Sequence, residues 1–404
     1  MLQLGAAISL SHAREAADRG DPVARAASVS THVAAMAGEV EASRSLPTAL
    51  LDALHGAALF RTLLPRAFNG DETDPASYVR MLETIAREDA STAWCVGQAS
   101  GCSMAAAYLR PEVAWEIWGG DPRAVLAWGA GPQGTAQVVA GGYVVTGTWG
   151  FASGGRHATW LGGHCRVIEL DGLPRRGKDG ELVERTMLFR KVAAQMTDTW
   201  HVMGLRGTGS DTYSVADLFV QDQYSVCRDS DDERQQPGTL YRFTTTHLYA
   251  AGFAGVALGI ARGALDALLE LARGKTPSAT VRALRDSPVV QSQVAQSEAK
   301  LRAARALLLT TLDEAWDRAR RAEGLTLDHK MSIRLASTYA VHQAKEVTSV
   351  AYQEAGATAI FESNPFERRF RDAHSVSQQV QARTTHFETV GQHLLGLPAN
   401  LRFV

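Results

Sequence analysis

The fold is decided by the stretch Gly142-Tyr-Val-Val-Thr-Gly-Thr-Trp-Gly-Phe-Ala-Ser-Gly-Gly-Arg-His-Ala-Thr-Trp160. Its first half is rich in Val, Thr, Tyr and Trp, which favour β-strands, and its second half contains a Ser-Gly-Gly turn. Similar runs between polar or glycine-rich turns predict strands over residues 136–140, 143–149, 159–167, 186–189, 199–203 and 212–220. The middle of the chain, residues 123–235, is therefore expected to form an antiparallel β domain.

Helices are predicted on both sides of this domain. Before it, Leu46, Leu50 and Leu54 recur at helical spacing, which indicates a helical domain over residues 21–122. After it, proline and glycine punctuation bounds apolar-striped helices at residues 248–273, 289–323, 327–355 and 375–395, typical of an antiparallel bundle over residues 240–404. The polar run 228–238 is expected to be a linker. The fold class is thus α+β, with a ligand site expected where the three parts meet.

Composition and charge exclude several classes of function. The 404 residues carry 41 Lys+Arg against 43 Asp+Glu, so nothing supplies the basic surface that a nucleic acid requires. Four cysteines without a CxxC spacing suggest neither a zinc site nor a disulfide framework, so a reducing cytoplasm is expected. Met1 to Leu10 has no basic segment typical of export, and the longest weakly polar stretch, Leu248 to Ile260, is shorter than a membrane span. No membrane association is expected.

The string Gly129-Ala-Gly-Pro-Gln-Gly134 matches GxGxxG, but a strand follows it where a dinucleotide fingerprint needs a helix. We therefore interpret it as a turn within the β domain. The sequence also lacks P-loop, HExxH and GxSxG strings, so no metal and no acyl-serine chemistry is expected. If the chemistry is redox, the reducing power must come from another protein.

Several segments resemble the acyl-CoA dehydrogenase superfamily. The opening stretch and Asp198-Thr-Trp-His-Val-Met-Gly-Leu-Arg-Gly-Thr-Gly-Ser-Asp211 carry the general resemblance. Ser91-Thr-Ala-Trp94, Phe370-Arg-Asp-Ala-His374 and the segment from His386 to Gly396 resemble its flavin-dependent monooxygenase branch, the oxygenase components of two-component aromatic hydroxylases. The resemblance covers the chain from about residue 25. It implies helical, β and four-helix-bundle domains in order, usually a homotetramer, with flavin between the β domain and the bundle.

The two main branches of this superfamily need different residues. A dehydrogenase needs a carboxylate base beside the flavin, and the family position of that base falls on Val380, nine residues after Arg371. The alternative family position falls on Tyr249, which is not acidic either. The sequence therefore favours a monooxygenase. An acyl-CoA dehydrogenase with a displaced base, and a non-catalytic scaffold with a flavin-binding fold, stay open as alternatives.

The resemblance also implies two catalytic residues. His374 would deprotonate a phenol-like substrate or hydrogen-bond the flavin peroxide, although a histidine capping the last helix would explain it equally. Ser153 would approach flavin N5 and O4, where its hydroxyl can donate a hydrogen bond, unless it only serves a turn.

The remaining implied site residues form three groups. Flavin-wall residues are expected at Trp128, Ala130, Gly131, Phe151 and Ala152. A flavin phosphate partner is expected at Arg282, with Arg285 beside it, although a solvated helix start would explain both. Substrate-pocket residues are expected at Trp94, Gln98 and Tyr249, with core packing as the alternative for Trp94.

The expected reaction is hydroxylation of an aromatic or similarly flat small molecule through a C4a-peroxyflavin. It would use molecular oxygen and reduced FMN or FAD from a separate flavin reductase. The sequence leaves open the substrate, the choice between FMN and FAD, oxidation at carbon, nitrogen or sulfur, the identity of the reductase and the role of Arg206.

Overall fold

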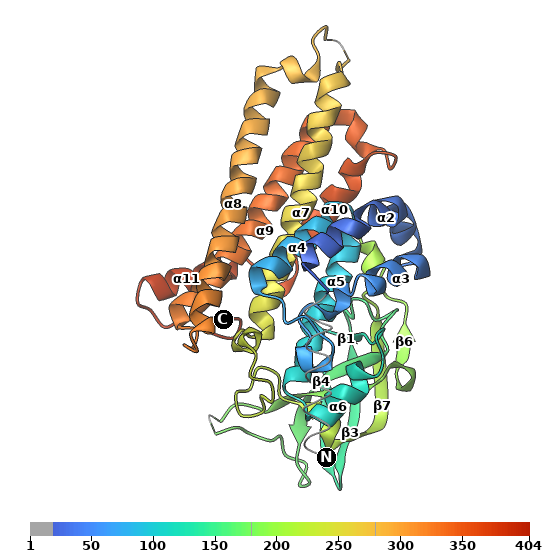
Figure 1. The fold of residues 1–404 in the computed structure, drawn as a ribbon, viewed down its shortest axis with the longest axis vertical. Helices are drawn as coiled ribbons and strands as arrows, with labels where there is room; N and C mark the ends of the chain where they lie inside the picture. The colour runs from blue at the N-terminus through green and yellow to red at the C-terminus, as the bar shows by residue number, and fades with distance from the viewer. Residues whose placement is uncertain (1–18, 179, 279) are drawn as a thin grey trace.

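The computed structural model describes residues 19–178, 180–278 and 280–404. The segment from Met1 to Leu10, in which no export signal was expected, lies outside this range. Figure 1 shows a β domain at one end of the molecule and long helices at the other. The N-terminal helices lie between them and contact both.

Aspartate and proline define where the N-terminal helices begin. The side chains of Asp21, Asp74 and Asp89 accept hydrogen bonds from the first turns of three helices, and proline occupies the first turn of three. The helices are α2 (Pro22–Ser43), α3 (Thr48–Gly56), α4 (Pro75–Ala86), α5 (Ala90–Ser103) and α6 (Pro111–Ala114). Short 3-10 or π segments follow or separate them at η1 (Leu59–Arg61), η2 (Arg66–Phe68), η3 (Met104–Ala107) and η4 (Trp115–Gly119). Every residue of α5 is buried, so this helix is the core of the domain.

One sheet forms the middle of the described chain. Its eight strands are β1 (Leu126–Trp128), β2 (Gly134–Val139), β3 (Gly142–Trp149), β4 (Trp160–Ile168), β5 (Glu184–Arg190), β6 (Gln195–Thr197), β7 (Thr212–Gln221) and β8 (Ser225–Val226). They lie in the order β6-β7-β3-β2-β4-β5-β8, with β1 beside β4. The sheet is mostly antiparallel as expected, but β4 pairs in parallel with β1 and β2. Residues 150–159 make this possible, because they carry the chain from the end of β3, past the intervening strand β2, to the start of β4.

The predicted strand at residues 199–203 is wrong. These residues form an irregular loop between β6 and the 3-10 turn η6 (Arg206–Thr208). The carboxylate of Asp211 accepts hydrogen bonds from the backbone N–H groups of Thr199 and Trp200, which a paired strand would use in its ladder. The carboxylate of Asp211 thus accepts the backbone hydrogen bonds that a neighbouring strand would otherwise accept.

The C-terminal helices are α7 (Thr245–Gly274), α8 (Pro288–Arg320), α9 (Leu327–Ala355), α10 (Pro365–Val376) and α11 (Thr385–Leu394). The predicted single helix over 375–395 is wrong, because the chain leaves α10 and passes through the turn η11 (Val380–Ala382) before α11. The Gln379 side chain accepts from the backbone of Gln381, and Arg334 donates to the Gln381 carbonyl. These bonds satisfy backbone groups that a continuous helix would have paired internally.

Helix α7 is the central helix of the molecule. It contains a window long and apolar enough for a membrane span, longer than the stretch recognised from the sequence, but 94% of that window is buried inside the protein. Its glycines at 252, 255, 259 and 263 lie against α4 and its C-terminal end. A Cβ at Gly259 would stand 2.4 Å from the carbonyl oxygen of Glu83, so only glycine allows this approach. These four glycines, which we call the glycine stripe, allow α7 of the bundle to pack closely against α4 of the N-terminal domain.

Candidate functional site

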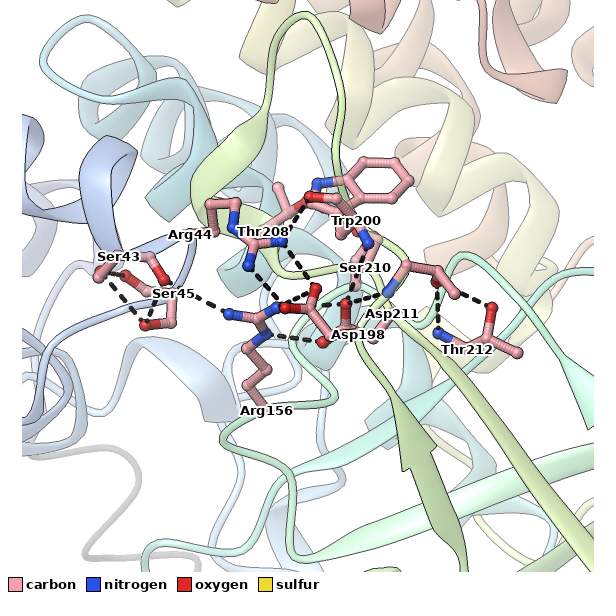
Figure 2. Close-up of polar contacts among 12 residues, drawn as sticks. Ser43, Arg44, Ser45, Arg156, Asp198, Trp200, Thr208, Ser210, Asp211 and Thr212 are labelled. Carbon is pink, nitrogen blue, oxygen red and sulfur yellow. Dashed lines mark hydrogen bonds and ion pairs between the residues drawn. The ribbon is translucent and has the colours of Figure 1, made fainter.

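A chain of hydrogen bonds joins α5 to the segment after β3. The indole Nε1 of Trp94 donates to Ser153 Oγ at 3.0 Å, and Ser153 Oγ lies 2.7 Å from Ser210 Oγ. Ser210 Oγ is in turn 2.7 Å from Thr208 Oγ1, which donates to the carbonyl oxygen of Leu205 at 2.8 Å. Figure 2 shows Thr208 and Ser210 in this arrangement. We call Ser153, Ser210 and Thr208 the hydroxyl relay.

The distances alone leave the donor open between Ser153 and Ser210 and between Ser210 and Thr208, but one assignment of the three hydroxyl protons satisfies every contact in the hydroxyl relay. Each hydroxyl has one proton, and Thr208 gives its proton to the Leu205 carbonyl, so Thr208 accepts from Ser210. Ser210 must then accept from Ser153. In this assignment Ser153 donates to Ser210, and the expected hydrogen bond from Ser153 to flavin stays a prediction. Ser153 also accepts from Trp94, and it keeps one lone pair to accept a further hydrogen bond.

Ion pairs fix the loop that carries the relay, as Figure 2 shows. Arg156 pairs with Asp211 at 2.7 Å and with Asp198 at 3.1 Å, and Arg44 pairs with Asp198 at 2.6 Å. The hydrogen bond from Arg44 lowers the pKa of Asp198 to about 2, so this carboxylate stays charged. The loop is therefore held to both the β domain and the end of α2.

Asp372 holds the same loop from the bundle. Its buried Oδ1 accepts a hydrogen bond from the backbone N–H of Leu205 at 2.6 Å. Burial raises the pKa of Asp372 to about 7, with the nearby Asp89 and Glu41 adding to the rise. The relay is thus connected at one end to α5 and at the other to α10.

Three aromatic rings stack beside the relay. Trp94 lies parallel to Phe253 with ring centroids 3.8 Å apart, and Phe253 stacks on Tyr249 at 5.5 Å. The Tyr249 hydroxyl donates to the carbonyl oxygen of Gln98 at 3.3 Å and lies 3.3 Å from Cys102 Sγ. The structure therefore brings together Trp94, Gln98 and Tyr249, the predicted substrate residues, between α5 and α7.

The predicted flavin wall is partly open to solvent. Phe151 is 65% exposed, holds a left-handed backbone with φ of 63°, and meets the edge of Trp200 at 5.9 Å. A large apolar side chain held in this uncommon conformation at the surface suits a flat ring that would cover it. Ala130 and Gly131 are exposed, whereas Ala152 is buried.

Trp128 faces away from this opening. Its buried indole lies under the guanidinium of Arg228, 4.7 Å from the ring centroid, and against His164 at 5.3 Å. A flavin at the opening would therefore meet the backbone of Trp128 and not its ring.

Two predicted residues lie apart from this group. The ring of His374 lies tilted against that of Phe370, with centroids 4.2 Å apart, and its Nε2 lies 3.4 Å from Ser349 Oγ on α9. It stands roughly 200° around α10 from Asp372, so the two residues occupy opposite faces of the helix. Arg282 is exposed in the connection between α7 and α8, which Figure 1 places at the end of the bundle farthest from the β domain.

The structure adds residues that sequence reasoning missed. Thr208, Ser210 and Asp372 all lie within the motifs that carried the family resemblance, but nothing in the strings says that they bond to one another. Phe253 stands four residues after Tyr249, which puts both on one face of α7 and could have revealed it. A polar cleft of about 800 Å³ lies between α2, the loop at 201–206 and α10, and none of the predicted site residues lines it.

Comparisons with known proteins show the family of this chain. Residues 251–383 match the model of the acyl-CoA dehydrogenase C-terminal domain. The chain is 31% identical to indole-3-acetate monooxygenase of Pseudomonas putida, over 89% of this chain and 90% of that protein. It is 28% identical to the oxygenase component of an FADH2-dependent resorcinol hydroxylase of Rhizobium sp., over 93% and 94%. A solved structure of XiaF from Streptomyces sp., in complex with FADH2 and glycerol, superposes with a TM-score of 0.88 at 25% identity, covering 96% of this chain and 98% of that one.

The fold and the domain match define an acyl-CoA dehydrogenase-like flavoprotein. Within that class, the chain belongs to the flavin-dependent monooxygenases, the oxygenase components of two-component systems that use reduced flavin. This decides for oxygenation among the alternatives that the sequence left open. It also accounts for Val380 and Tyr249 where a dehydrogenase would carry its base.

Proposed function

We propose that this protein hydroxylates a small aromatic molecule at the junction of α5, α7 and the β domain, and that the hydroxyl relay selects reduced flavin there. The observation that carries the proposal is the direction of the relay. Ser153 offers a lone pair and no free proton. Reduced flavin carries a hydrogen on N5 that can be donated to this lone pair, whereas oxidised flavin presents only a lone pair at N5.

The residues present fit a flavin at this position. Phe151 supplies an exposed apolar surface for one face of the ring, and Ser153 supplies the acceptor at its edge. When bound, reduced flavin supplies the electrons that activate dioxygen for transfer to the substrate. The protein contributes orientation and exclusion of water, through the stacked rings of Trp94, Phe253 and Tyr249.

His374 is our proposed acid–base residue. Burial and the charge of Lys345 lower its pKa, so the imidazole is neutral at pH 7 and able to take a proton from a phenol or an indole. Its present partners are Ser349 and Phe370, so this role requires the end of α10 to turn toward the site when ligands bind.

Assembly completes the proposal. The exposed Arg282 is at the far end of the bundle, so it would serve the flavin phosphate of a second copy in a homotetramer. Either FMN or FAD would arrive reduced from a separate flavin reductase, in the cytoplasm. The names of the relatives make indole-3-acetate and resorcinol the first substrates to test.

The test compares affinities for the two redox states of flavin in Ser210→Ala. Removal of the Ser210 acceptor frees the Ser153 proton for oxidised flavin, so the preference for reduced flavin should fall about three- to tenfold. Anaerobic titrations with reduced FMN and aerobic titrations with oxidised FMN give this ratio of dissociation constants.

Thr199→Ala is the matched control, because Thr199 also joins another hydroxyl in the same loop, Thr212, but is exposed. An unchanged preference in Ser210→Ala would contradict the proposed selection of reduced flavin.

A further inference from the structure

Arg228 is a half-buried cation at the same junction that the proposed reaction does not yet use. Its guanidinium lies over the indole of Trp128, 4.7 Å from the ring centroid, and its Nε donates to Thr186 Oγ1 at 3.2 Å. Thr186 Oγ1 is also 2.8 Å from Nδ1 of His164. The segment 228–238 was expected to be a linker, so no role was predicted for this arginine.

The carboxylates near Arg228 along the chain are used elsewhere. Asp229 accepts from the backbone and the hydroxyl of Thr245 at the start of α7, at 2.8 and 2.9 Å. Glu233 pairs with Arg185 at 2.5 Å, and Asp231 pairs with Arg234 at 2.9 Å. Within residues 19–178, 180–278 and 280–404, no carboxylate lies within ion-pair distance of Arg228.

The buried Asp229 is a carboxylate on which this cation acts, because the charge of Arg228 lowers a pKa that burial raises. Three neutral side chains also lie near the cation. Burial keeps His164 uncharged by lowering its pKa, and burial raises the pKa of Cys102 to about 12 and the pKa of Tyr249 well above its ordinary value. The charge of Arg228 acts on all three groups. A guanidinium in such surroundings attracts an anion more strongly than one at an open surface.

One face of α5 leads from the hydroxyl relay toward this cation. Trp94, Gln98 and Cys102 follow one another at intervals of four residues, which spans about 12 Å along the helix. Trp94 bonds to Ser153 at one end, and Cys102 at the other end contacts the backbone of Trp128, beneath Arg228. The distance suits an aromatic ring that carries a short acidic side chain.

We propose that Arg228 binds the carboxylate of the substrate, so that the preferred substrates are aromatic acids and not neutral aromatics. The inference rests on the proposed function, whose substrate class it narrows. A guanidinium can hold a carboxylate through two parallel hydrogen bonds, which fixes both the position and the rotation of the ring. Arg228 would thereby determine which ring atom faces the hydroxyl relay.

The test measures binding in pairs of compounds that differ only in the carboxylate. Indole-3-acetate is compared with 3-methylindole, and 4-hydroxyphenylacetate with 4-methylphenol, by anaerobic calorimetric titration of the full-length protein with reduced FMN present. We expect the wild type to bind the acid roughly 30-fold or more tightly in at least one pair. In Arg228→Gln that ratio should fall to near one, and Arg228→Lys should restore part of it.

Arg190→Gln is the matched control, since Arg190 also covers an indole, that of Trp160 at 4.3 Å, but its side chain is 56% exposed. It should keep the wild-type ratio. Equal binding of acid and neutral compound by the wild type in every pair, or a ratio that survives in Arg228→Gln, would overturn the inference. Admission of oxygen then tests the proposed function separately, because binding is measured before any turnover and hydroxylated product only after it.

Discussion

The two ends of the long bundle differ in how far their side chains are buried and hydrogen-bonded within a single chain. Where α5, α7 and α10 meet the β domain, buried polar groups are tied together, from Trp94 through the hydroxyl relay to Asp372. At the far end, in the connection between α7 and α8, Val281 is 99% exposed and Arg282 is exposed beside it. The end beside the β domain is therefore part of the protein interior, and the far end is exposed to solvent.

This difference separates the proposed reaction at the junction, which uses residues of one chain, from the proposed flavin-phosphate contact at the far end, which needs a second copy. The junction holds the hydroxyl relay, a stack of aromatic rings and a cation, all contributed by a single chain. The far end holds an exposed valine and an exposed arginine, which a second copy would cover in the proposed homotetramer. Three substitutions test whether the division is real.

The largest effect is expected from His374→Ala. Loss of a general base should reduce hydroxylation about 10²- to 10⁴-fold while flavin affinity and the helical content stay close to those of the wild type. Product formation and hydrogen peroxide release, measured together, separate lost hydroxylation from lost flavin oxidation. Ser349→Ala, which removes only the present partner of His374, is the control. Undiminished hydroxylation in His374→Ala would remove this residue from the junction's chemistry.

A smaller effect is expected from Asp372→Asn, through pH. The folded protein holds the pKa of Asp372 at about 7, above the ordinary 3.8, so the folded state binds a proton that the unfolded state releases. The free energy of unfolding should therefore fall as pH rises from about 4 to 7, by roughly 3 kcal/mol from this group. Asparagine keeps an acceptor for Leu205, so the variant should lose this slope and be the more stable form at pH 8.

Urea unfolding at several pH values measures this slope. Asp198→Asn serves as its counterpart, because the pKa of Asp198 is lowered and its contribution is lost as pH falls. If Asp372→Asn kept the same slope, the slope would come from another group and the pKa of Asp372 would not be raised in the folded protein.

The smallest effect is expected from Arg282→Ala at the far end. An exposed side chain contributes little to the fold, so the midpoint of thermal unfolding should stay within about 1 °C of the wild type. If a second copy uses Arg282, reduced-flavin affinity should fall about three- to tenfold only in the assembled protein. Sedimentation gives the protein concentration at which copies assemble. Titrations with reduced flavin above and below that concentration then compare the affinities of the assembled and the unassembled protein. If the wild type and Arg282→Ala bind reduced flavin with equal affinity in the assembled protein, the far end takes no part in flavin binding.

Much of the architecture could be predicted from the sequence, because strong local signals set it. The helix over 327–355 was predicted to the residue, since Gly356 ends it and Thr326 begins it. Strands with clear β-branched content were placed within about two residues of their ends. Local patterns failed where side chains replaced backbone partners, at the loop pinned by Asp211 and at the break made by Gln379.

The site was harder to predict than the fold. Trp94, Gln98 and Tyr249 were predicted from the resemblance to face the substrate, and they meet in the structure. The relay could not be predicted, because Ser153 and Ser210 are 57 residues apart and hydroxyls carry no distinctive pattern. Arg228 was hidden for a different reason: its polar neighbours in the sequence indicated a linker, and only the fold shows its position over Trp128 and the ion pair of Glu233 with Arg185.

The glycine stripe of α7 has a consequence for how the protein is made. Its partner α4 precedes it by more than 160 residues, so their contact closes a long loop and forms late in folding. During synthesis α4 leaves the ribosome before α7, and α7 is long and apolar enough to cross a membrane, so its apolar surface stays exposed until the two helices pack. A C-terminal fragment made without the first 120 residues would keep that stripe bare and associate with itself.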